Sequence, residues 1–165
     1  MRTPLVLKIQ TAVLVAGTAF AWYTVVVDFV RFYGFEGTVF KVQDCIVPNP
    51  VTTPCFYGAW AFLIALIWTL RLLKRRVYSA SGIRNLMLFL AAGTIFAFGN
   101  FGYGYMKFLA NSGKPTVGCS GLLMTNPFFT PCFIGAMLFL ASLIVSIVAW
   151  LSARNTVLPE QLSVR

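Results

Sequence analysis

The sequence predicts an all-α integral membrane protein, a four-transmembrane-helix bundle built from two tandem helical-hairpin repeats. Three observations predict this fold. First, 59% of the 165 residues are hydrophobic and only 10% are charged, with a mean hydropathy of +0.82, whereas soluble domains carry about 25% charged residues. Second, four apolar stretches are long enough to cross a bilayer. Third, the two halves of the chain share sequence.

The four predicted spans cover residues 9–30, 54–73, 85–106 and 131–152. A span needs about 20 mostly apolar residues. In hydrocarbon it must satisfy its own backbone hydrogen bonds, which makes each stretch a helix. The third and fourth spans carry no charged residue. The spans therefore form two hairpins, in residues 1–80 and 81–165, and the second hairpin ends in a short tail.

An internal repeat relates the two hairpins. Residues 49–67 and 126–144 are identical at 12 of 19 positions. Gly17 and Ala21 in the first span recur as Gly93 and Ala97 in the third, and small residues four apart allow close helix packing in lipid. Because each unit has two spans, both units have the same orientation and a pseudo-two-fold axis along the membrane normal is expected.

The basic residues predict the orientation and argue against a nucleic-acid partner. Nine basic residues and one acidic residue lie in the termini and around the connection between spans two and three, against four basic and three acidic residues on the other side. The positive-inside rule places both termini in the cytoplasm, in a plasma or inner membrane. The net charge of +9 is thus an orientation signal, because the basic residues flank spans and do not interleave with exposed aromatics. The expected partners are the lipid bilayer and another membrane protein or a second copy.

The cysteines lie two in each predicted outward loop, on the periplasmic or extracellular side: Cys45, Cys55, Cys119 and Cys132. An even number on an oxidising face predicts two disulfides. The duplication favours pairing within each hairpin, and the two crossed connectivities stay open. No metal site is expected, because the chain has no histidine and the cysteine spacings are not those of zinc sites.

Cys55 and Cys132 each follow a Thr-Pro pair. Threonine suits an N-cap and proline the first helical position, so each cysteine is expected in the first turn of a helix. The positive end of the helix dipole stabilises a thiolate there. This position suits the nucleophile of thiol–disulfide exchange, with Cys45 and Cys119 as its partners.

With four spans and two outward cysteine pairs, the chain resembles the disulfide-generating membrane oxidoreductases of the bacterial DsbB type and the vitamin K epoxide reductase type. The resemblance implies quinone as the electron acceptor. The chain departs from those families because it has no C-x-x-C pair, and its two cysteine pairs have nearly identical surroundings in sequence.

Three polar residues within or beside the spans are candidate sites: Asp28, Arg31 and Asn100. Asp28 precedes Arg31 by three residues, a spacing that predicts an ion pair near the membrane interface. Asn100 lies inside the third span, where its amide is expected to form a hydrogen bond across helices.

These features predict a non-catalytic membrane subunit or scaffold without a cofactor, because the cysteine pairs look alike and no catalytic motif is present. The alternative is a quinone-coupled thiol–disulfide oxidoreductase in which Cys55 and Cys132 are nucleophiles. A second alternative is a small transporter with its site at the repeat interface, suggested by the duplication and by three glycines of the third span: Gly99, Gly102 and Gly104.

Overall fold

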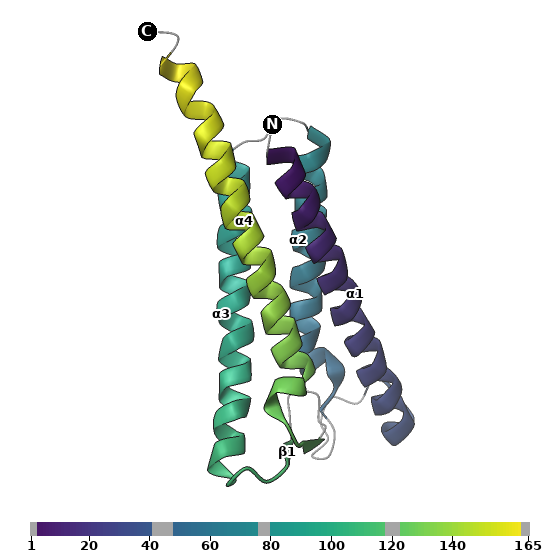
Figure 1. Ribbon diagram of the computed structural model, residues 1–165. Coiled ribbons are helices and arrows are strands. Elements are labelled where there is room, and N and C mark those ends of the chain that lie inside the picture. Colours follow the sequence, from purple (N-terminus) through teal and green to yellow (C-terminus); the bar gives the residue numbers. More distant parts are fainter. Residues whose placement is uncertain (1–2, 41–47, 76–79, 118–122, 163–165) are drawn as a thin grey trace.

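A computed structural model describes residues 3–40, 48–75, 80–117 and 123–162 (Figure 1). Its four long helices are α1 (Thr3–Glu36), α2 (Pro54–Arg75), α3 (Ala80–Ala110) and α4 (Pro131–Leu162). Each is long and apolar enough to cross a membrane, which confirms the predicted four-helix membrane fold. The helices are longer than the predicted spans, because hydropathy detects only the apolar part of a helix. The duplication itself stays a prediction from the sequence.

Both chain termini lie at one end of the bundle, which we call the terminal end (Figure 1). The opposite end, the loop end, carries two 3₁₀ helices, η1 (Pro50–Thr52) and η2 (Pro127–Phe129). It also carries a two-stranded antiparallel ribbon of β1 (Thr116–Val117) and β2 (Leu123–Met124). Which end faces the cytoplasm stays a prediction from the basic residues.

The helices pack in a ring, with α1 against α2 and α4, and α3 against α4 and α2. We call the contact between two neighbouring helices a seam. The α2–α3 seam is the least closely packed of the four. The bundle is therefore tighter within each hairpin and along α1–α4 than between α2 and α3.

Two stacked phenylalanine rings lie at the centre of the bundle. The Phe62 and Phe139 ring centroids are 3.9 Å apart and the ring planes differ by 27°. A Cβ atom added to Gly17 would lie 2.5 Å from the Phe62 ring, and one added to Gly93 would lie 2.7 Å from the Phe139 ring. The two glycines expected at packing surfaces thus make room for a ring from the second helix of the same hairpin.

Helices α2 and α4 begin with the same local structure. The side-chain oxygens of Asn49 and Asn126 each accept the backbone N–H two residues later, at 3.0 Å. The hydroxyls of Thr53 and Thr130 each donate to the carbonyl three residues earlier, at 2.7 Å. The Thr130 hydroxyl also accepts the N–H of Phe133 at 3.3 Å, the N-cap bond that the sequence predicts. These turns place one cysteine in the first turn of each helix.

We expect Gly17→Ala and Gly93→Ala to lower the thermal unfolding temperature in lipid nanodiscs. The added methyl group would overlap a buried ring that is itself held by stacking, and overpacking of this kind costs about 1–3 kcal/mol. Gly102→Ala is the control, because no described atom lies within 4 Å of a Cβ at that position. Equal unfolding temperatures for Gly17→Ala and Gly102→Ala would contradict this prediction.

Candidate functional site

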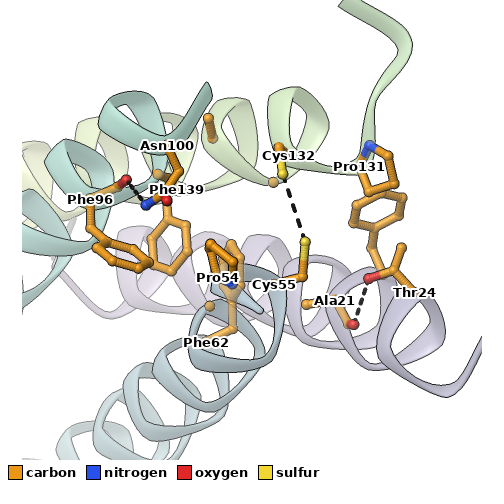
Figure 2. Close-up of a pocket in the computed structure, with 15 residues that line it drawn as sticks. Ala21, Thr24, Pro54, Cys55, Phe62, Phe96, Asn100, Pro131, Cys132 and Phe139 are labelled. Carbon is orange, nitrogen blue, oxygen red and sulfur yellow. Dashed lines mark hydrogen bonds between the residues drawn. The ribbon is translucent and has the colours of Figure 1, made fainter. Parts of the chain in front are cut away.

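A cavity of about 50 Å³ lies among the four helices in the loop-end half of the bundle (Figure 2). On α2 and α4 the residues that line the cavity extend from the first residue of each helix to Phe62 and Phe139. These two rings therefore close the cavity on the side of the terminal end. The remaining lining residues come from all four helices: Phe20, Ala21, Thr24, Pro54, Cys55, Gly58, Phe96, Ala97, Asn100, Pro131, Cys132, Gly135 and Ala136. The surface of the cavity is therefore predominantly apolar.

The sulfurs of Cys55 and Cys132 face each other across this cavity (Figure 2), with 3.7 Å between the two Sγ atoms. A disulfide bond would be about 2.05 Å long, so the two sulfurs are in contact without being bonded. Within the described part of the chain Cys55 is a free, half-buried thiol, whereas Cys132 is not free. The structure thus brings together two cysteines that are 77 residues apart.

The free thiol of Cys55 contradicts the disulfide that the sequence analysis expected for it. The physical reason is the orientation of the first turn of α2, which directs the Cys55 sulfur toward Cys132 inside the bundle. Cys45 and Cys119 lie outside the described residues. The pairing of Cys119 with Cys132 therefore stays a prediction.

The polar side chains of the cavity wall bond to their own helices. The Thr24 hydroxyl donates to the Ala21 carbonyl at 2.8 Å, and the Asn100 amide donates to the Phe96 carbonyl at 2.8 Å. The expected bond from Asn100 across helices was wrong, because the carbonyl four residues earlier lies within reach of its Nδ2. Asn100 still lines the cavity and is partly exposed.

A larger groove of about 490 Å³ opens at the α2–α3 seam. It shares Pro54, Gly58, Phe96, Asn100 and Phe139 with the cavity. Its other lining residues are Thr52, Tyr57, Ala61, Phe89, Ala92 and Gly93. Pockets that hold drug-sized molecules measure about 300–1,000 Å³, so a ring-shaped ligand fits the groove and not the smaller cavity. The groove therefore adjoins the cysteine cavity through shared lining residues, although neither cysteine is part of its own lining.

The ion pair expected in α1 is present. The Arg31 guanidinium donates to the Asp28 carboxylate at 3.2 Å, and Asp28 is buried. Neither residue lines the cavity or the groove. The glycines that suggested a transporter, Gly99, Gly102 and Gly104, have no described atom within 4 Å of an added Cβ and also lie outside both linings.

Sequence reasoning did not identify the phenylalanines that enclose the sulfurs. A usable signal was present, because Phe62 follows Cys55 by seven residues and Phe139 follows Cys132 by seven. Residues seven apart occupy the same helix face. Together with the expected pseudo-two-fold axis, this spacing indicates that ring and sulfur face the bundle interior.

Comparison of the chain with known protein families, curated proteins and solved structures finds no match. The fold defines the class as a four-helix bundle of membrane-spanning type. Its functional interpretation rests on the chemistry of the cysteine cavity.

A double variant, Cys45→Ser with Cys119→Ser, is expected to form a Cys55–Cys132 disulfide when a mild oxidant is added to membranes. The two sulfurs, now 3.7 Å apart, need to move closer by less than the length of one disulfide bond. Both sulfurs line the same small apolar cavity, which keeps them near each other. Mass spectrometry of the digested protein would detect the cross-linked peptide, and adding Cys55→Ser provides the control. Failure to cross-link would show that the two sulfurs are not in contact in the bilayer.

Proposed function

We propose that this protein is a membrane thiol–disulfide oxidoreductase with quinone as its electron acceptor. The observation that supports the proposal is the contact between the free thiol of Cys55 and the sulfur of Cys132. Thiol–disulfide exchange requires a thiolate to attack a neighbouring disulfide sulfur. Two sulfurs at 3.7 Å in an apolar cavity are placed for that step.

The proposed exchange uses a Cys119–Cys132 disulfide. Cys55 gives up its proton and attacks the Cys132 sulfur, so that a Cys55–Cys132 bond forms as the Cys119–Cys132 bond breaks. Cys119 leaves as a thiolate and takes up a proton. Electrons and atoms balance within the chain, because one disulfide and one thiol are present before and after the step.

The net reaction would convert two thiols of a substrate protein into one disulfide. The two electrons and two protons that are released would reduce one quinone to quinol. The groove at the α2–α3 seam supports this part of the proposal, because its aromatic and small side chains suit a flat apolar ring and it shares residues with the cysteine cavity.

The scaffold and transporter interpretations stay predictions that differ from this proposal in their consequences. A scaffold needs inert disulfides in its loops and gains nothing from a free thiol beside Cys132. A transporter tolerates the loss of its cysteines. The position of the sulfurs favours the oxidoreductase, and the outward orientation of the loops remains the prediction from charge.

The redox state of the cysteines in native membranes is the decisive test. We expect at least one cysteine pair to titrate between about −120 and −230 mV in a glutathione series, the range of known exchange proteins. Differential thiol alkylation followed by mass spectrometry measures this. In Cys55→Ser that titration should be lost. Pairs that remain oxidised down to about −300 mV are structural and would support the scaffold instead.

Ala92→Trp should impair use of quinone without affecting contact between the sulfurs. Ala92 lines the groove but not the cavity, so a bulky side chain fills the route for the ring. We expect the KM for quinone to rise about tenfold or more, equivalent to about 1.4 kcal/mol of binding free energy. Ile95→Trp is the matched control, because Ile95 lies on the same helix and is 74% exposed. An unchanged KM in Ala92→Trp would place the quinone elsewhere.

A further inference from the structure

A buried polar layer lies on the terminal-end side of the stacked rings. The layer contains one residue from each helix: Gln10 on α1, Thr69 on α2, Leu86 on α3 and Ser146 on α4. Each of them is seven positions, or about two helical turns, from the glycine or phenylalanine of its helix at the centre of the bundle. Each of these four side chains is at most 1% exposed. Three of these side chains are polar although the surrounding core is apolar.

The side chains on α1 and α4 are unsatisfied. Gln10 forms no hydrogen bond with any described residue through either its Nε2 or its Oε1 atom, and the same holds for the hydroxyls of Ser142 and Ser146. The hydroxyls of Thr69 and Thr94 differ, because each donates to the carbonyl four residues earlier at 2.8 Å. The hydroxyl of Thr116, on β1 at the loop end, is also buried without a described partner. Among the four long helices, the unsatisfied groups lie on α1 and α4, the two helices of one seam.

Gln10 and Ser146 lie at the same depth in neighbouring helices. Gly17 contacts the ring of Phe62, which stacks on Phe139, so these residues mark one level of the bundle. Gln10 precedes Gly17 by seven residues and Ser146 follows Phe139 by seven. Because α1 and α4 run in opposite directions, both steps lead toward the terminal end. Ser142 is one turn from Ser146 on the same face.

We propose that Gln10, Ser142 and Ser146 bind an internal water molecule between α1 and α4. A fully buried amide is costly without hydrogen bonds, and a buried water makes two to four bonds to such groups. The amide offers both donors and acceptors, and each hydroxyl offers one donor and two acceptor positions. All three side chains are neutral, which suits water and gives no charge to hold an ion.

The proposed water would join the α1–α4 seam and leave the α2–α3 seam without an equivalent link. The positions that correspond to Gln10 and Ser142 in the other repeat are Leu86 and Ala65, which are both apolar and buried. Ser146 corresponds to Thr69, whose hydroxyl already donates to its own helix. The groove opens at the α2–α3 seam. The water site would thus make one side of the bundle fixed while the other side stays open, whatever the reaction at the cysteines.

Solid-state NMR of the full chain in lipid bilayers tests this directly. The probe is magnetisation transfer from water to the side-chain amide of ¹⁵N-labelled Gln10, whose signal is assigned by its loss in Gln10→Leu. We expect rapid transfer in the wild type and a marked loss in the Ser142→Ala, Ser146→Ala double variant. Thr94→Val, which removes a hydroxyl bonded to its own helix, should leave the transfer unchanged. No transfer to Gln10 in the wild type would overturn the proposal.

Thermal unfolding gives an independent result. Gln10→Leu copies the residue at the equivalent position of α3 and is expected to fold. If the water is bound, Gln10→Leu and Ser146→Ala each lower the unfolding temperature, and the double variant falls no further than the more affected single variant. If Gln10 is dry, Gln10→Leu raises the unfolding temperature because it removes an unpaired buried amide, which contradicts the proposal.

Discussion

The stack of Phe62 on Phe139 is the contact on which the rest of the structure depends. Each ring occupies space that Gly17 or Gly93 leaves open, so all four helices meet at one level. Protein interiors are close-packed and do not accommodate extra atoms without rearrangement. The level of this stack therefore sets the depth of every other layer, including the cysteine cavity on one side and the buried polar layer on the other.

The contact between the Cys55 and Cys132 sulfurs follows from the sequence spacing between each cysteine and its phenylalanine. Seven residues separate Cys55 from Phe62 and Cys132 from Phe139, so stacked rings bring the two sulfurs to the same depth and face. The Asn and Thr turns at the loop end begin α2 and α4 at the residue before each cysteine. Contact at 3.7 Å thus results from local caps together with one packing contact in the core.

The two seams between the hairpins differ although the hairpins share sequence. Polar groups gather at α1–α4, where Gln10 and the two serines are fully buried. On α2 and α3, Leu86 and Ala65 stand at the positions equivalent to Gln10 and Ser142, and Thr69, equivalent to Ser146, bonds to its own helix. The groove opens at the α2–α3 seam. The two seams therefore differ in polarity and in packing although the two halves of the chain share sequence.

The sequence by itself determined the features that depend on neighbours along the chain. These are the four spans, the first turns at Thr53 and Thr130, and the ion pair between Asp28 and Arg31. Only the tertiary structure decided that Cys55 faces Cys132 and that Phe62 stacks on Phe139. Such contacts depend on the rotation of each helix about its axis. In a membrane helix the lipid-facing and core-facing sides are both apolar, as Ile95 at 74% and Leu90 at 0% exposure illustrate, so hydropathy does not report that rotation.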